Sequence, residues 1–550
     1  MRAKLYLEKL LKQALDKNNL EWSAKLSLEL PKDKQFGDMA TNAAMVLSKQ
    51  AGMSPRDLAE ALRKELQGDP DIEAIEIAGP GILNFTFKLR FWQQMVGVIQ
   101  KEADYYGASD IGAGKRVLEE YVSANPTGPL HIGHGRGAAV GDSLARILRF
   151  SGYEVMTEYY LNDAGRQMSL LATSIWSRYL ELLGQDNGFP EEGYRGGYIY
   201  DLAKAILEEY NQSLLSWPKD EAIALCGQLG TKKIFDSIKN DLKVFEAEHD
   251  AWFSEKQLIE NHKVEDTLDW LVDKGLVYED NGALWFQSSL FGDDKDRVVR
   301  KSDHTLTYFA SDIAYHANKF SRGFEYLIDV WGADHHGYIP RIKAAVQGLG
   351  HTGVDLEVVL IQLVNLLRNG EQVSMSTRAG EFDTLADVCH EVGVDAARFM
   401  FLTRKSDSHL DFDLELLKEK SMDNPVYYVQ YAHARICSMI GKAKEKKIDS
   451  EDDCIGVNGH LDTNEDIELL KTLDGFPETV QVAARTLSPH HISFYLQELA
   501  GMLHRYYNKH NVLNSGDQSL TKARLALMKA VRQVLRNGLG LLGVSAPETM

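Results

Sequence analysis

The sequence predicts a multidomain α/β protein, in which a doubly wound parallel sheet lies between an N-terminal α+β unit and a C-terminal α-helical bundle. Three observations predict this fold class. The chain has 550 residues, which is too long for a single hydrophobic core. Strand, loop and helix patterns alternate in the middle of the chain, and helix patterns alone follow them. We expect domains over residues 1–110, 111–394 and 395–550.

The N-terminal unit combines helix and strand patterns. A first helix is predicted by the spacing of four apolar residues, Leu7, Leu10, Leu11 and Ala14. A second helix is expected over 54–66, with Pro55 at its start. Two extended runs, 72–77 and 82–87, flank a Pro-Gly turn and predict a strand, a turn and a strand.

The middle of the chain predicts the parallel sheet. A strand over 116–122 is followed by a polar loop and a long helix. The same order recurs around 326–350, and a further strand is expected near 358–363. This alternation is typical of a doubly wound sheet. We expect a mostly helical insertion over about 165–285.

Composition limits the class of protein and its partners. The net charge of −19 means that any surface for nucleic acid must be local. No apolar run is long enough for a signal peptide or a membrane span, so we expect a soluble, cytosolic protein without membrane or DNA partners. The four cysteines lie far apart, which argues against a zinc ribbon or a disulfide framework.

The strongest chemical signal is the loop 123–134, which joins the strand at 116–122 to a helix. Open α/β sheets bind nucleotides at such positions, and a helix N-terminus attracts phosphate. His131 and His134 lie on one side of the first helical turn and can donate to phosphate oxygens, while Gly133 lets a base or ribose approach the backbone. Taken alone, the two histidines also fit a zinc pair or an ordinary surface, but no further zinc ligands are evident.

The run from Asn125 to His134, Asn-Pro-Thr-Gly-Pro-Leu-His-Ile-Gly-His, resembles the ATP-binding signature of class I aminoacyl-tRNA synthetases, in the form found in arginyl-tRNA synthetases. The similarity continues through 135–142 and 158–165 and covers essentially the whole chain. The resemblance implies a Rossmann-like catalytic domain that uses ATP and Mg²⁺ to activate L-arginine and transfers it to tRNA(Arg). It also implies that bound tRNA is required for activation.

A second set of candidate residues concerns the amino acid. Tyr308 and Asp312 share a helix face at i, i+4, and a carboxylate with a tyrosine hydroxyl can pair with a guanidinium, although this pair is also compatible with a structural role. The resemblance implies that Tyr308 and Asp312 hold the guanidinium, and that Glu120 and Asn125 hold the α-amino and carboxylate ends. It further places His336 near arginine. It places Gly332 and Asp334 near ATP.

The second nucleotide signature of class I enzymes departs from its usual form. In the run 373–380, Ser374 and Thr377 stand where lysines are expected, while Met375 and Ser376 match the nucleotide-binding positions. A cation normally neutralises the charge that develops on pyrophosphate. Our candidate substitute is Arg378, with Lys115 as a weaker alternative.

The C-terminal region contains the predicted surface for tRNA. The segments 394–398 and 424–435 resemble the start of the family's helical anticodon-binding domain, and 36–42 resembles its N-terminal tRNA-contacting domain. Four basic residues lie on one side of a predicted helix, Lys522, Lys529, Arg532 and Arg536. Tyr506 and its neighbour Tyr507 are candidates for base stacking, with core packing as an equal alternative.

These observations predict an arginine–tRNA ligase, expected to work as a monomer. Catalysis is assigned to His131, His134 and Arg378, without a protein nucleophile or a protein-held metal. Two alternatives stay open from the sequence. One is another class I synthetase or nucleotidylyl transferase, and the other is a non-catalytic tRNA-binding relative.

Overall fold

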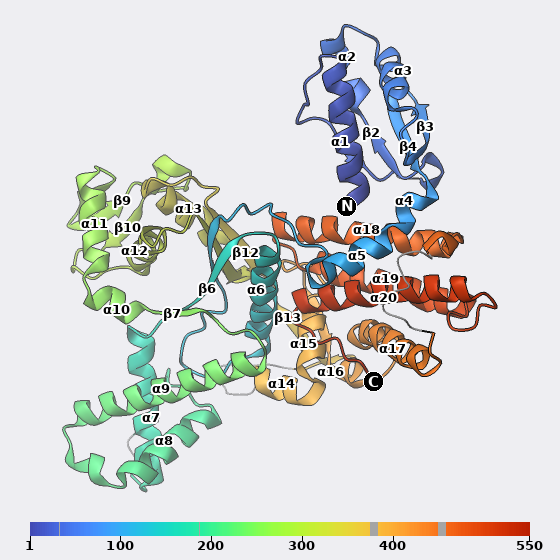
Figure 1. Ribbon diagram of the computed structural model, residues 1–550. Coiled ribbons are helices and arrows are strands. Elements are labelled where there is room, and N and C mark those ends of the chain that lie inside the picture. Colours follow the sequence, from blue (N-terminus) through green and yellow to red (C-terminus); the bar gives the residue numbers. More distant parts are fainter. Residues whose placement is uncertain (32, 186–187, 374–382, 449–457) are drawn as a thin grey trace.

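The computed structural model describes residues 1–550 except 32, 186–187, 374–382 and 449–457. Figure 1 shows the N-terminal region standing beyond helix α18, a central parallel sheet, and a bundle of long C-terminal helices. Among the described residues, no helix is long and apolar enough to cross a membrane. The predicted fold class is therefore confirmed in its three parts.

The N-terminal region is an antiparallel sheet with strand order β1-β2-β4-β3, and three helices pack against it. Helix α3 begins as the sequence predicts, because Pro55 occupies its first turn and the Ser54 side chain accepts a hydrogen bond from the backbone N–H of Asp57. The elements are α1 (Arg2–Lys17), β1 (Leu28–Glu29), β2 (Met39–Thr41), α2 (Ala43–Ala51), α3 (Pro55–Leu66), β3 (Ile72–Ala78) and β4 (Ile82–Phe87).

Two short helices, α4 (Leu89–Gln93) and α5 (Met95–Glu102), connect this region to the central sheet. That sheet has the order β12-β11-β5-β6-β7, and every neighbouring pair is parallel. The carboxyl ends of its strands therefore meet at one edge. The strands and the helices beside them are β5 (Arg116–Glu120), α6 (Ile132–Phe150), β6 (Glu154–Leu161), β7 (Ala251–Ser254), α10 (Glu255–Glu260), α12 (Tyr308–Ser321), β11 (Tyr326–Gly332), α13 (Ile339–Gly348) and β12 (Leu356–Ile361).

The range 165–285, expected to be a mostly helical insertion, has two different halves. Helices α7 (Arg166–Leu182), α8 (Gly197–Tyr210) and α9 (Lys219–Val244) pack together. Strand β7 then returns to the parallel sheet beside β6. After it, α11 (Lys263–Asp273) leads into an antiparallel sheet formed by β8 (Val277–Asp280), β9 (Ala283–Phe286) and β10 (Arg297–Arg300). The helical part thus ends near Val244.

The C-terminal region is not helical throughout, because β15 (Leu410–Asp413) pairs in parallel with β13 (Val364–Arg368). Strand β14 (Glu371–Gln372) completes this small sheet. Helices α14 (Leu385–Val392), α15 (Val394–Phe401) and α16 (Leu414–Lys418) surround it. The bundle consists of α17 (Pro425–Glu445), α18 (Asn464–Arg485), α19 (His490–Lys509) and α20 (Gln518–Leu541).

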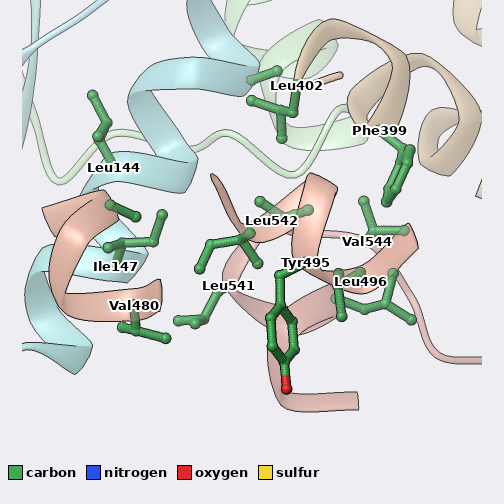
Figure 2. Packing of buried hydrophobic residues seen from close by; sticks show 14 of the residues in the cluster. Leu144, Ile147, Phe399, Leu402, Val480, Tyr495, Leu496, Leu541, Leu542 and Val544 are labelled. Atoms are coloured by element: carbon green, nitrogen blue, oxygen red, sulfur yellow. The ribbon is translucent and has the colours of Figure 1, made fainter. Parts of the chain in front are cut away.

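A shared hydrophobic core joins the sheet to the bundle. Figure 2 shows Leu144 and Ile147 of α6 among apolar side chains from α15, α18, α19 and the end of α20. Leu144 and Ile147 are fully buried, as are Phe399 and Leu496. Because α6 also begins at the two histidines, the bundle supports the helix that positions them.

Glu119 of β5 is a buried carboxyl group on the side of the sheet that faces α6. Its side chain is fully buried, and neither carboxylate oxygen has a hydrogen-bond partner among the described residues. Burial, with a smaller contribution from Asp142, raises the pKa of Glu119 well above its ordinary value of 4.5.

We expect the stability of Glu119→Gln, compared with that of the wild type, to increase as the pH rises above about 4.5. Below that pH both the folded and unfolded states hold the proton. Above it the unfolded chain ionises while folded Glu119 does not, so the stability of the wild type falls by about 1.4 kcal/mol per pH unit until the folded pKa is reached. The unfolding temperatures of variant and wild type should therefore diverge between pH 5 and pH 8. Glu154→Gln, at an exposed position of β6, is the control and should show no such divergence.

Candidate active site

The two histidines of the loop after β5 form the cap of helix α6. His131 is the N-cap residue, and its Nδ1 accepts a hydrogen bond from the backbone N–H of Gly133 at 3.1 Å. His134 Nδ1 accepts from the backbone N–H of His131 at 3.2 Å, and the two rings stack with centroids 3.6 Å apart. The imidazoles thus occupy backbone N–H groups at the start of α6, where the sequence predicts phosphate to bind.

This capping fixes the chemical form of both rings. An Nδ1 that accepts a hydrogen bond carries no hydrogen, so a neutral ring has its hydrogen on Nε2. Burial lowers the pKa of His131, and burial together with His131 lowers the pKa of His134 to about 3. Both rings are therefore neutral near pH 7 and carry their hydrogen on Nε2, which is the form that can donate to phosphate oxygens.

The start of α6 is tied to the segment that follows the second signature. The backbone N–H of Leu385 donates to Leu130 at 2.8 Å, and Thr384 forms a β-bridge with His131. Gly135 allows this approach, because a Cβ there would lie 2.5 Å from Leu385 Cδ1. Of the predicted nucleotide-binding residues, Met375, Ser376 and Arg378 lie outside the described residues.

Lys115, the alternative substitute for the missing lysine, is at the wrong edge of the sheet. It precedes β5, whereas the histidines follow the carboxyl end of that strand. Its ammonium lies over the ring of Tyr326, the first residue of β11, 5.0 Å from the centroid. Lys115 therefore faces away from the histidines, and this prediction is wrong.

The turn after β11 is exposed to solvent. Gly332 ends the strand, and a Cβ on it would collide with the Asp334 carboxylate. Asp334 is exposed and lies 3.5 Å from His335 Nε2, and His336 is also exposed, with Nδ1 3.2 Å from the Ala333 carbonyl oxygen. These residues lie at the same sheet edge as the histidine cap, because β11 and β5 are parallel neighbours.

Asp312 lies on the first turns of α12, one helical turn after Tyr308. Burial raises the pKa of Asp312, and the Tyr338 hydroxyl, which donates to its Oδ2, opposes that shift. Tyr308, at the first position of the helix, is 70% exposed. The structure thus combines a partly buried carboxylate with an exposed tyrosine at the start of one helix.

A second acidic residue lies at this place, and no sequence motif predicts it. Glu255 follows β7 directly and is only 5% exposed. Burial raises its pKa, and the charge of Asp312 raises it further. Two neighbouring carboxyl groups that each bind a proton more tightly than usual can together attract a cation. Only the knowledge that β7 belongs to the parallel sheet could have placed Glu255 here.

The residues expected at the other end of the amino acid are Glu120 and Asn125. Glu120 ends β5, and its Oε2 accepts a hydrogen bond from the ammonium of Lys319 on α12 at 2.7 Å. Asn125 Nδ2 donates to Gln167 Oε1 on α7 at 2.8 Å. Lys319 was not predicted, although it continues the helix face that begins with Tyr308 and Asp312.

The C-terminal bundle contradicts one predicted contact. The stacking role of Tyr506 is wrong, because its ring is 1% exposed and its hydroxyl donates to Asp466 Oδ1 at 2.7 Å. Arg536 of α20 is exposed, whereas Lys522, Lys529 and Arg532 are partly buried. Arg532 and Arg536 lie near α17, since both lower the pKa of His433, after the larger effect of its burial.

A cavity of about 640 Å³ lies between α17 and the end of α19. Tyr507, the neighbour of Tyr506, lines it, and the Arg435 guanidinium lies 3.6 Å from the centroid of the Tyr507 ring. Lys442 and Lys509 add positive charge to the wall. Adjacent helical residues face different directions, and the sequence does not show which of the two tyrosines faces the cavity.

The fold and the histidine-capped turn define the class of protein. Three family models match the chain: "tRNA synthetases class I (R), catalytic domain" over 98–413, "Arginyl tRNA synthetase N terminal domain" over 5–87, and "DALR anticodon binding domain" over 429–550. The chain is therefore a class I aminoacyl-tRNA synthetase.

Similar proteins specify the family further. The arginine–tRNA ligase of Oleidesulfovibrio alaskensis is 56% identical, and that of Lawsonia intracellularis is 52% identical, each over 100% of both chains. The arginyl-tRNA synthetase structure of Thermus thermophilus has a TM-score of 0.78 with 23% identity over 100% of both chains, which shows the shared fold. This chain belongs to the arginyl-tRNA synthetase family.

Proposed function

We propose that the chain attaches arginine to tRNA(Arg) in two steps at the carboxyl edge of the parallel sheet. The carboxylate of arginine attacks the α-phosphorus of ATP, forming arginyl-adenylate and releasing pyrophosphate. A terminal ribose hydroxyl of tRNA then attacks the activated carbonyl carbon and releases AMP. The observation that carries this function is the pairing of a neutral histidine cap after β5 with two neighbouring carboxyl groups at the same sheet edge, the partly buried Asp312 and the buried Glu255.

The nucleotide lies against the histidine cap in this proposal. His131 and His134 donate from Nε2 to phosphate oxygens, and catalysis follows from positioning and charge stabilisation. Gly133 and Gly332 let the nucleotide approach the backbone, and the exposed Asp334 accepts from the ribose. Met375, Ser376 and Arg378 are proposed to complete the phosphate site.

We expect Mg²⁺ to arrive bound to ATP, because it prefers phosphate oxygens and water to a dedicated protein cage. Among the described residues, no group of three or more histidine, cysteine, aspartate or glutamate side chains is arranged to hold a metal ion. The steps above use only the side chains of the protein.

In this proposal arginine lies between Asp312 and Glu255 at one end of the site and Glu120 at the other. Asp312 and Glu255 face its guanidinium, which matches a carboxylate in shape and charge, and Tyr308 covers it from the exposed side. Glu120 accepts from the α-ammonium, Asn125 donates to the carboxylate, and His336 lies nearby. Two carboxylates at the guanidinium end support arginine over neutral amino acids.

We test the function by pyrophosphate exchange into ATP, with each amino acid in turn and with or without tRNA(Arg). We expect exchange with arginine alone among the twenty, and only when tRNA is present. Exchange with a different amino acid would point to another synthetase. Absence of exchange under every condition would favour a tRNA-binding protein without catalysis.

The proposed tRNA surface runs over the bundle. The cavity between α17 and α19 offers Tyr507 and Tyr431 for stacking with an unpaired base, while Arg435 and Lys442 supply positive charge. Lys522, Lys529, Arg532 and Arg536 are proposed to contact phosphates, with exposed Arg536 as the best placed. The net charge of −19 makes such local basic patches necessary.

Arg435→Ala should raise the KM for tRNA(Arg) roughly 10-fold, because stacking and charge in this cavity are worth about 1–3 kcal/mol. The KM for arginine should not change. Aminoacylation at varied tRNA concentration measures the effect. Arg485→Ala, at an exposed position on α18, is the matched control and should leave both constants unchanged. An unchanged KM for tRNA in Arg435→Ala would remove the cavity from the proposed surface.

We also propose that the enzyme works as a monomer in the cytoplasm. One chain supplies the histidine cap, both acidic positions and the basic cavity, so the reaction needs no residue from a second copy. Sedimentation of the active enzyme at assay concentration tests this statement.

A further inference from the structure

A buried cluster of charges lies directly behind Glu120. Lys319 of α12 is fully buried, and its Nζ lies 2.7 Å from Glu120 Oε2 and 2.8 Å from Asp329 Oδ1. The same ammonium lies 4.3 Å from the centroid of the Tyr315 ring. Asp329 is also fully buried, whereas Glu120 is 8% exposed. Glu120 is thus the member of the cluster nearest to the site.

The three charged groups of the cluster shift one another's pKa values. Burial raises the pKa of Glu120, Lys319 opposes that shift, and Asp329 adds to it. Burial alone would lower the pKa of Lys319, but Asp329 and Glu120 raise it above its ordinary value. Burial raises the pKa of Asp329, but Lys319 and His316 more than reverse this, so its pKa is lowered. Lys319 is therefore a cation between two carboxyl groups. When both carboxyl groups are ionised, the three side chains carry one excess negative charge beside the site.

The cluster also connects the two ends of the arginine site. His316 Nε2 lies 3.0 Å from Asp329 Oδ2, and His316 Nδ1 lies 2.8 Å from the backbone carbonyl oxygen of Asp312. Asp312, His316 and Lys319 are spaced i, i+4 and i+7, so they share one face of α12. Asp329 and Glu120 are register partners on the adjacent strands β11 and β5.

These contacts have a mechanical consequence. The polar side chains form one continuous series from Glu120 through Lys319, Asp329 and His316 to the backbone of Asp312. Since Lys319, Asp329 and His316 are all buried, the distance between the carboxylate of Glu120 and the backbone of Asp312 is fixed by packed secondary structure. Arginine must match that distance to reach both carboxylates.

We propose that Lys319 is a positioning residue for arginine, which holds the Glu120 carboxylate in place to receive the α-ammonium of the substrate. Lys319 acts through Glu120 and does not touch the substrate. The shared contact with Asp329 keeps Lys319 from fully neutralising Glu120, so Glu120 retains its attraction for an ammonium group. This inference rests on the proposed role of Glu120 as the acceptor for the α-ammonium.

The test compares arginine with 5-guanidinopentanoate, which lacks only the α-amino group. Dissociation constants of both ligands are measured by titration calorimetry on the full chain. We expect the wild type to bind arginine roughly 10- to 100-fold more tightly than the analogue, as for a hydrogen bond between charged groups. Glu120→Gln should bring this ratio close to one. Lys319→Met should lower the ratio by about 10-fold while changing the affinity for the analogue less than about 2-fold.

The double variant Glu120→Gln/Lys319→Met shows whether Lys319 acts through Glu120. If it does, adding Lys319→Met to Glu120→Gln leaves the ratio unchanged. Lys343→Met, which removes the partner of Glu357 at 3.3 Å on the surface of the same domain, is the matched control. It should bind both ligands like the wild type.

The outcomes separate the inference from the function on which it rests. An unchanged ratio in Glu120→Gln contradicts the proposed role of Glu120. If Glu120→Gln brings the ratio of the two affinities close to one while Lys319→Met leaves it unchanged, only the inference about Lys319 is contradicted. The same holds if Lys319→Met weakens the binding of arginine and of the analogue equally. If Lys319→Met does not fold, Asp329→Asn serves instead, because it leaves Lys319 paired with Glu120. It should also lower the ratio, and an unchanged ratio there overturns the inference.

Discussion

Asp312→Asn should lower kcat/KM for arginine by roughly 30- to 5,000-fold, which is the effect of about 2–5 kcal/mol expected when one partner of a buried charge pair is removed. Asparagine keeps the shape of the side chain and can still accept the hydrogen bond from Tyr338, so the start of α12 should be preserved. What disappears is the negative charge that faces the guanidinium. Aminoacylation at varied arginine concentration measures the loss, and the KM for ATP should stay within about 2-fold.

A control and a companion variant sharpen this expectation. Glu357→Gln removes a partly exposed carboxylate of β12 that pairs with Lys343, and surface pairs contribute about 0–1 kcal/mol, so its activity should match the wild type. Glu255→Gln should also reduce kcat/KM for arginine, because Glu255 is buried beside Asp312. Wild-type kcat/KM in Asp312→Asn would remove α12 from the arginine site.

The strands and helices that the sequence predicted are those with a clear period and clear end signals. Helix α3 begins at Pro55 behind the Ser54 cap, and β3 and β4 flank a Pro-Gly turn, so local chemistry determines their limits. Strands β7 and β15 were missed because each has only four residues. Their identity depends on pairing with β6 and β13, which no local pattern records.

The site was predictable where a motif is contiguous. His131, Gly133 and His134 stand together in the sequence, and their position after β5 follows from the alternation of strand and helix. Glu255 and Lys319 could not be found in this way, because each enters the site only through the assembled sheet and the orientation of α12. The capping by both imidazoles was also hidden, since histidine is not a usual N-cap residue.

The choice between Tyr506 and Tyr507 shows a further limit. Both lie on α19 beside basic residues, and the sequence offers stacking or packing for either. The structure buries Tyr506 against Asp466 and leaves Tyr507 38% exposed in contact with Arg435. Adjacent residues on a helix differ by about 100° in direction, so an error of one position exchanges core and surface.

Among the glycines of α6, Gly141 is the one at which substitution by alanine should reduce the stability of the catalytic domain most. A Cβ at Gly141 would lie 2.6 Å from Tyr121 Cβ and 2.7 Å from Tyr121 Cδ1. Tyr121 cannot move aside easily, because it is fully buried and its ring stacks on His249 with centroids 4.0 Å apart. We expect a loss of about 1–3 kcal/mol in stability, as is usual for overpacking, together with a large loss of kcat, because Tyr121 directly follows Glu120.

Gly137→Ala in the same helix provides the matched comparison. A Cβ at Gly137 meets no atom within 4 Å, so only helix propensity acts there. Alanine is favoured over glycine inside a helix by about 0.5–1 kcal/mol, so this variant should be slightly more stable and fully active. Thermal unfolding and aminoacylation of the two variants measure the contrast. If Gly141→Ala matched Gly137→Ala in both measurements, α6 would not be held against Tyr121, and the close packing that aligns the histidine cap with Glu120 would have to be abandoned.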